Sequence, residues 1–399
     1  MRPGATRSTG VLAAALLLLL ALLLATATAA GVARADGGAP NLVYVAQEGG
    51  GLVVIDIAKR QVVGHLAVGG APSAVLLSYD SRFAYVAQRA TGRVAIVNAR
   101  TQQVEAELPV GANPQAMVLG LPNLLYVANS GSNSVTVLDP DARRTLASIA
   151  VGRHPSGLAI AGAGSGITTT DINDTELYVA NTDDDSVYVI STKLRRVIAT
   201  IPAPGGPLGV AIPPAGGVAY VATRSGAVLA VSLSGHRLLG TVFHLSGPAG
   251  TMDYDAVTGQ VYVPDPTAGK VYVLRPASDA GSSAPFSIPA EPASTLPFAG
   301  GPAAVAITFD GAYGFVAERD AGQVVMFDAA AHKTLATVTV GGAPVALVTG
   351  AYAPVVDRTA ANVIGIALGV AVLLALFGAA LVVSLRIRQR RQASVKGPS

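Results

Sequence analysis

The chain has 399 residues, of which 51% are hydrophobic and 13% charged, with 45 Gly, 25 Pro and no Cys. The lack of cysteine excludes disulfides, thiol catalysis, iron–sulfur clusters and covalently attached c-type haem. The net charge of +3 comes from the ends, because eight of the 27 basic residues lie in residues 1–35 or after Leu385 while 24 acidic residues lie between them. This distribution argues against a nucleic-acid partner, which would need a basic patch within the fold.

Residues 1–35 have the three parts of a secretory signal peptide. Arg2 and Arg7 precede an uncharged Leu/Ala run at 11–25, and small residues around Arg34 offer a cleavage site. An uncleaved anchor is the alternative, because residues 11–33 are long enough to cross a bilayer.

An aromatic residue followed by Val-Ala, or a close relative of that pair, recurs through the middle of the chain. The recurring residues are Tyr44, Tyr85, Tyr126, Tyr178, Tyr220, Tyr262 and Phe315. The steps between them are 41, 41, 52, 42, 42 and 53 residues, which indicates seven units with insertions at 161–173 and 276–294. A period near 42 residues is typical of repeat folds such as propellers.

Each unit contains four short apolar runs separated by turn residues, as at 114–119, 124–129, 134–139 and 145–151. Alternating β-branched runs bounded by Gly, Pro, Asn and Ser predict antiparallel strands joined by hairpins. Four such strands per unit are typical of a propeller blade. We therefore expect an all-β, seven-bladed β-propeller over residues 41–350.

The repeat is out of phase with the ends of the chain, since the first unit starts at its second strand. The last run, 344–348, has the character of a first strand with no unit after it. We expect this run to pair with the strand of Tyr44 and to close the first blade, which removes an exposed sheet edge.

Residues 363–385 carry no charge, and a membrane-spanning helix needs about 20 such residues. Arg386, Arg388, Arg390 and Arg391 follow directly, as the positive-inside rule expects on the cytoplasmic side. The sequence thus predicts a linker at 351–361, a transmembrane helix at 362–385 and a basic cytoplasmic tail at 386–399. We expect a single-pass protein of a bacterial cell membrane with the propeller outside.

Residues 126–129 and 178–181 both read Tyr-Val-Ala-Asn, and each is followed by Ser-Val-x-Val. These segments resemble the YVTN-type β-propeller repeat, and the resemblance extends over about residues 41–350. It implies the propeller fold. For function it implies several alternatives, because similar blades occur in surface-layer proteins, secreted binding proteins, lactonases and haem-bearing reductases.

The third residue after each blade aromatic is polar, and ring geometry would bring these seven side chains near one mouth of the channel. We consider them a candidate ligand-binding set, with satisfaction of their own β-turns as the alternative. The set is Gln47, Gln88, Asn129, Asn181, Thr223, Asp265 and Glu318.

Because the repeat starts at a second strand and ends at a first strand, we expect the second-to-third turns and the Gly-x-x-Pro turns to lie on the face away from the membrane, the outward face. Charged residues of these turns give further candidates on that face. Arg153 and His154 form a candidate contact for an anionic ligand, and Asp183, Asp184 and Asp185 form a weak candidate calcium site. The segment from Asp171 to Glu176 has a similar composition without the twelve-residue calcium-loop spacing. No cofactor is predicted, with calcium as the one ion to consider.

No catalytic motif is present, and no two histidines have metal-ligand spacing. The favoured function is therefore a binding or scaffolding module whose outward face engages a protein, glycan or cell-wall polymer. The alternative is a propeller hydrolase or lactonase with a metal-dependent site at the channel mouth. Convergent acidic or histidine groups at that mouth would favour the enzyme, and a shallow mixed polar surface would favour binding.

Overall fold

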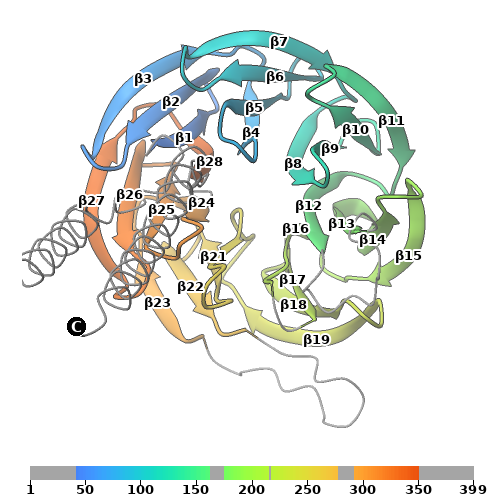
Figure 1. The fold of residues 1–399 in the computed structure, drawn as a ribbon. Coiled ribbons are helices and arrows are strands. Elements are labelled where there is room, and N and C mark those ends of the chain that lie inside the picture. The colour runs from blue at the N-terminus through green and yellow to red at the C-terminus, as the bar shows by residue number, and fades with distance from the viewer. Residues whose placement is uncertain (1–41, 162–174, 215–216, 277–291, 350–399) are drawn as a thin grey trace, which may run out of the picture. The chain divides into compact units, whose positions relative to one another are not determined.

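The computed structural model describes residues 42–161, 175–214, 217–276 and 292–349. These residues form seven four-stranded antiparallel sheets, which Figure 1 shows arranged as blades around a common axis. The first strand of each blade lies nearest the axis and the fourth lies on the outside (Figure 1). The predicted all-β seven-bladed propeller is confirmed.

The blades are named 1 to 7 in chain order, and each is given from its first to its fourth strand. Blade 1 consists of β28 (Pro344–Thr349), β1 (Leu42–Gln47), β2 (Gly51–Asp56) and β3 (Gln61–Ala67). Blade 2 consists of β4 (Pro72–Leu77), β5 (Phe83–Gln88), β6 (Arg93–Asn98) and β7 (Gln103–Pro109). Blade 3 consists of β8 (Pro114–Gly120), β9 (Leu124–Asn129), β10 (Ser134–Asp139) and β11 (Arg144–Ala150).

Blade 4 consists of β12 (Pro155–Ala161), β13 (Glu176–Asn181), β14 (Ser186–Ser191) and β15 (Arg196–Pro202). Blade 5 consists of β16 (Pro207–Ala211), β17 (Val218–Thr223), β18 (Ala227–Ser232) and β19 (Arg237–His244). A short 3-10 helix, η1 (Thr182–Asp184), lies in the turn after β13. Blade 6 consists of β20 (Asp253–Tyr254), β21 (Val261–Asp265), β22 (Lys270–Leu274) and β23 (Ser294–Pro297). Blade 7 consists of β24 (Pro302–Ile307), β25 (Tyr313–Glu318), β26 (Gln323–Asp328) and β27 (Lys333–Thr339).

The last strand closes the first blade, as the sequence predicts. β28 pairs with β1 in antiparallel register, with Val43 opposite Thr349 and Ala46 opposite Ala346. Because β28 is the first strand of a blade whose other three strands come from the opposite end of the chain, the ring is held shut by backbone hydrogen bonds rather than by loop contacts.

The second and third strands of each blade are buried on both faces, because neighbouring blades pack face to face. In β9, Leu125, Tyr126, Val127 and Ala128 are each at most 1% exposed. The fourth strands are mostly exposed or half-buried, because only one of their faces meets a neighbour; β11, for example, buries one of its seven residues. The core is therefore distributed between the blades, which explains why almost every second-strand residue is apolar.

The blade aromatics join each blade to the next. All seven are at most 1% exposed, and four tyrosine hydroxyls donate to the carbonyl that directly follows the third strand of the next blade. These hydroxyl–carbonyl pairs are Tyr44–Ala99 (3.5 Å), Tyr178–Leu233 (3.4 Å), Tyr220–Arg275 (3.0 Å) and Tyr262–Ala329 (3.3 Å). Burial raises the pKa of Tyr44 to about 12, so its hydroxyl keeps its proton at physiological pH. We call this contact the tyrosine latch.

Strand order divides the loops between two faces. The turns between second and third strands and the linkers between blades form one face, here called the turn face. The first-to-second and third-to-fourth loops form the other, here called the termini face, where β1 begins and β28 ends. The predicted signal peptide, linker, transmembrane helix and tail, and most of both insertions, lie outside the described residues. Within the described residues, no helix is long and apolar enough to cross a membrane.

Candidate functional site

The seven polar residues singled out in the sequence lie at the last position of the second strands, directly under the turn face. Six of them are at most 3% exposed, and Gln47 is half-buried. Because the second strands pair with the outer edge of the first strands, these residues lie farther from the axis than the first strands do (Figure 1).

Most of these side chains bond to the backbone of the turn face. Asn129 accepts a hydrogen bond from the Gly111 N–H in the linker from the preceding blade (3.0 Å), and it donates to Thr136 Oγ1 (2.9 Å). Asp265 accepts from Ser246 N–H in the same way (2.7 Å), and Glu318 accepts from Gly300 N–H (3.0 Å).

Gln47, Gln88 and Thr223 donate to backbone carbonyls at 2.5–2.9 Å, whereas the buried side-chain oxygen of Asn181 has no hydrogen-bond partner among the described residues. The fold thus uses most of the set to anchor linkers and turns. Its role in ligand binding stays a prediction.

The charged turn residues of blades 4 and 5 meet in one ion-paired cluster on the turn face. Arg153 binds Asp184 through both its backbone N–H (2.6 Å) and its guanidinium Nε (2.5 Å). Asp183 pairs with the guanidinium of Arg224 (3.0 Å) and lies 3.5 Å from His154 Nδ1. The backbone N–H and then the guanidinium of Arg153 lower the pKa of Asp184, so it stays ionised.

The side chains of the acidic run Asp183–Asp185 are therefore bonded to other groups of the same chain. Asp185 accepts from the backbone N–H groups of Gly205 and Gly206, at 3.1 and 2.7 Å. Glu176, at the end of the other calcium-like segment, pairs with His236 at 3.1 Å, while Asp171, Asn173 and Asp174 lie outside the described residues. In the part of the chain that the structure describes, no three His, Cys, Asp or Glu side chains are grouped to hold a metal ion.

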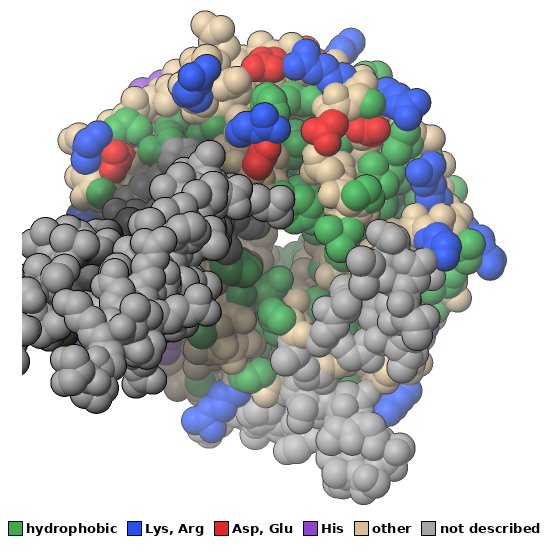
Figure 2. Space-filling model, in the orientation of Figure 1, with side chains coloured by type: hydrophobic (Ala, Val, Ile, Leu, Met, Phe, Trp, Pro, Cys, Tyr) green, Lys and Arg blue, Asp and Glu red, His purple; other side chains and the backbone are tan. Residues whose placement is uncertain are grey.

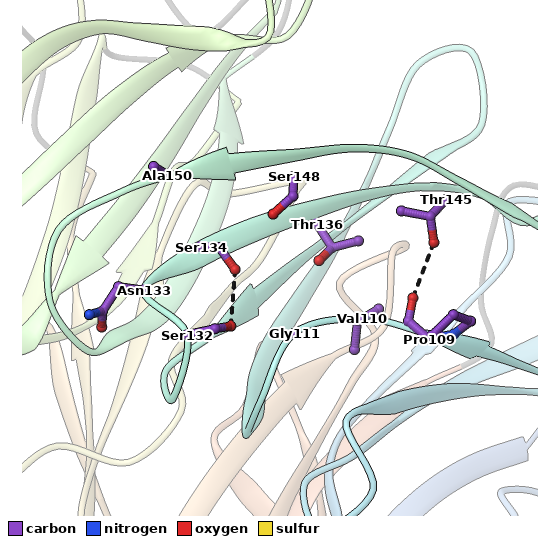
Figure 3. Close-up of a pocket in the computed structure, with 10 residues that line it drawn as sticks. All are labelled: Pro109, Val110, Gly111, Ser132, Asn133, Ser134, Thr136, Thr145, Ser148 and Ala150. Atoms are coloured by element: carbon purple, nitrogen blue, oxygen red, sulfur yellow. Dashed lines mark hydrogen bonds between the residues drawn. The ribbon is translucent and has the colours of Figure 1, made fainter.

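A groove rich in hydroxyl groups lies where the linker after β7 passes beside β10 and β11 (Figure 3). It has a volume of about 460 Å³ and no charged residue in its lining. Ser132 and Ser134 share a hydrogen bond of 3.1 Å, and Thr145 donates to the Pro109 carbonyl (3.1 Å). Its side-chain donors and acceptors come from Ser132, Asn133, Ser134, Thr136, Thr145 and Ser148. We call it the hydroxyl groove.

A second cavity, of about 420 Å³, lies at the termini-face ends of the first strands and is here called the channel-mouth pocket. Figure 2 shows the ring hollowed at its centre, with hydrophobic side chains along the hollow. The side chains that line the pocket are mostly aliphatic, with Leu119 from β8, Leu158 and Ile160 from β12, and Ile212 directly after β16. Asp253, Tyr254 and Tyr79 add the ionisable groups, and no Lys, Arg or His of the described residues lines it.

Asp253 breaks the repeat at this pocket. Each first-strand segment is counted here as the six residues from the proline that starts or precedes the strand. In the sheet register Asp253 lies opposite the blade aromatic Tyr262, a place that is held in the other blades by Val348, Leu76, Val118, Ala159, Ala211 and Ala306. Asp253 is the one charged residue among the seven first-strand segments counted in this way. Sequence reasoning missed it because it looked for recurring polar positions, whereas the signal is a single departure from an apolar one.

The carboxyl group of Asp253 ties blade 6 to blade 7. Its Oδ2 accepts a hydrogen bond from the backbone N–H of Ile307 in β24 (2.8 Å). Blade 6 needs this tie, because β20 has two residues and Thr251 reaches across to bridge Ala304 of blade 7. Burial raises the pKa of Asp253 to about 6, against the hydrogen bonds from Ile307 and Tyr254 that favour the ionised form.

This raised pKa predicts a pH-dependent stability that Asp253→Asn removes. The folded state holds the Asp253 proton more tightly than the unfolded chain, so its contribution is complete below about pH 4 and is lost as pH rises through about 6. A shift of about two pKa units corresponds to about 3 kcal/mol. Chemical denaturation followed by circular dichroism should show D253N gaining up to that amount over wild type between pH 4 and 7.5, whereas Asp310→Asn on the same face should run parallel to wild type.

The sequence matches no model of a protein family and no curated protein. The YVTN-type resemblance thus stays a prediction, while the fold that it implies is confirmed.

Among solved structures, the chain is similar to Kuenenia stuttgartiensis hydrazine synthase, with a TM-score of 0.58 and 21% identity over 69% of this chain and 89% of that one. A functionally unknown protein from Desulfotomaculum acetoxidans gives a TM-score of 0.63 and 12% identity over 77% and 98%. The dihydro-heme d1 dehydrogenase NirN, in complex with DHE, gives 0.51 and 18% over 77% and 65%. At these identities the likeness shows the fold alone.

Proposed function

We propose that the chain is a membrane-anchored extracellular binding module whose turn face holds a polar component of the cell envelope. The anchoring rests on the sequence, where an uncharged run at 363–385 is followed at once by a cluster of arginines. The turn face points away from the face where β28 ends, so a helix that follows β28 would leave the turn face open to partners.

The observation that carries this proposal is the hydroxyl groove. Its lining offers the exposed hydroxyls of Ser132, Thr145 and Ser148, the Asn133 amide and linker backbone groups, and none of the described residues that line it is charged. Such a surface forms many weak, directional hydrogen bonds, which suits the hydroxyl-rich surface of a neutral glycan or cell-wall polysaccharide. The neighbouring charges of blades 4 and 5 are paired with one another, which leaves a mixed polar surface beside the groove.

Ser148→Tyr should test this assignment, because Ser148 is exposed and lies across from Thr136 in the groove. The larger side chain fills the groove, so we expect retention on insoluble cell-wall sacculi that carry their polysaccharide to fall at least tenfold. Thr200→Tyr is the matched control, since Thr200 is exposed at the same register in blade 4, across from Tyr188.

The measurement is cosedimentation of the full-length protein with sacculi, before and after removal of the attached polysaccharide. Equal retention of wild type and Ser148→Tyr on the complete sacculi would remove the groove from the function. Binding that persists after the polysaccharide is stripped would point to the peptidoglycan itself.

A further inference from the structure

Asp253 places a carboxylate in a pocket whose described side chains are mostly apolar. An ionised carboxylate in such surroundings is costly unless charge or hydrogen bonds compensate it. Backbone N–H groups of Ile307 and Tyr254 supply part of this compensation. No Lys, Arg or His of the described residues lines the pocket, so none of these residues supplies a cation there. A ligand that completes the site would bring its own positive charge.

The rest of the lining indicates what should carry that charge. Tyr79 and Tyr254 border the same pocket as Asp253, and aromatic rings attract cations, most strongly where water is excluded. The aliphatic wall formed by β8, β12 and the end of β16 favours an apolar body next to the charge. A volume of about 420 Å³ falls in the usual range for small-molecule sites.

We propose that the channel-mouth pocket binds a small organic ammonium compound, with the cationic group against Asp253 and an apolar body against the aliphatic wall. A bare metal ion fits the pocket poorly, because Ca²⁺ takes six to eight oxygen ligands, whereas the described residues of the lining supply one carboxylate. An organic anion would meet the carboxylate without a counter-charge. This site lies on the termini face, away from the hydroxyl groove, and does not depend on the function proposed for that groove.

The test uses three probes that share one apolar body: 2-phenylethylamine, 2-phenylethanol and phenylacetate. At pH 7.5 the first is cationic like a lysine side chain, the second is neutral and the third is anionic. Isothermal titration calorimetry of the full-length protein should show saturable binding of the amine, at least tenfold weaker binding of the alcohol and no binding of the acid. Equal binding of amine and alcohol, or no saturable amine binding, would overturn the proposal.

Two variants place the binding in the pocket. Asp253→Asn keeps an oxygen acceptor for the Ile307 N–H but removes the charge, so amine binding should fall at least tenfold. Tyr79→Leu removes a ring that is 40% exposed and should weaken amine binding severalfold. Asp310→Asn makes the same exchange at an exposed loop residue outside the lining and should leave it unchanged. Amine binding that survives Asp253→Asn would place the amine elsewhere.

Discussion

Removing β28, Pro344–Thr349, is expected to unfold the propeller rather than to shorten it. β28 is the innermost strand of blade 1 and also contacts β24 and β4, the first strands of the blades on either side. Its loss would open the ring and expose the edge of β1. Leu347 is buried and Val345 and Val348 are half-buried, and full burial of such a side chain is worth roughly 1.5–3 kcal/mol. Losing these contacts together with the backbone pairing of β28 removes a large part of the roughly 5–15 kcal/mol that holds a whole domain folded.

The matched control moves the strand instead of deleting it. A permuted chain with residues 343–349 placed before Leu42, joined through a short Gly-containing turn, keeps the pairing of Val43 with Thr349 and of Ala46 with Ala346. We expect this chain to regain the far-ultraviolet circular dichroism spectrum and the cooperative unfolding of wild type. A deleted chain that still unfolds cooperatively near the wild-type midpoint would contradict the role assigned to β28.

Closure of this kind could be predicted from the sequence because the repeat itself shows the phase of each strand. The run at 344–348 has the same proline-led apolar pattern as the first strands of blades 2, 3, 4, 5 and 7, while the propeller begins at a second strand. β9 and β10 occupy the predicted residues 124–129 and 134–139, and the fourth strand β11 begins one residue before its prediction. Strands that repeat a pattern seven times are easy to place, because an error in one unit conflicts with the others.

The candidate site was harder to predict because it depends on contacts between blades. The polar residue that ends each second strand is visible as a repeat, but its partner lies in a linker about 18 residues earlier, as with Asn129 and Gly111. The pairing of Arg153 with Asp184 likewise links two turns of neighbouring strands. The position of Asp253 in a first strand is readable from the repeat, whereas the pocket around it exists only once several blades are assembled.

Tyr262→Ala is expected to destabilise the fold by about 3–5 kcal/mol, the usual cost of removing a large buried ring. Tyr262 is fully buried, packs against Phe327 at a centroid distance of 5.9 Å and donates its hydroxyl to the Ala329 carbonyl at 3.3 Å. Tyr262→Phe keeps the ring and removes the latch alone, so it should cost about 0.5–1.5 kcal/mol. Denaturant midpoints followed by circular dichroism separate the two costs, and equal losses in both variants would mean that the hydroxyl contributes more than the packing.

The ring itself supplies a reason to expect the small cost for the hydroxyl. Phe315 occupies the latch position of blade 7, so the boundary with blade 1 has no such hydroxyl. That boundary is joined instead by the contact of β28 with β24, by Gln47 donating to the Val340 carbonyl (2.9 Å), and by an ion pair between Arg319 and Glu48 (2.5 Å). Because one boundary holds together without the tyrosine latch, we expect the hydroxyl contact to add only a small part of the stability of an interface that is formed mainly by packing of the ring.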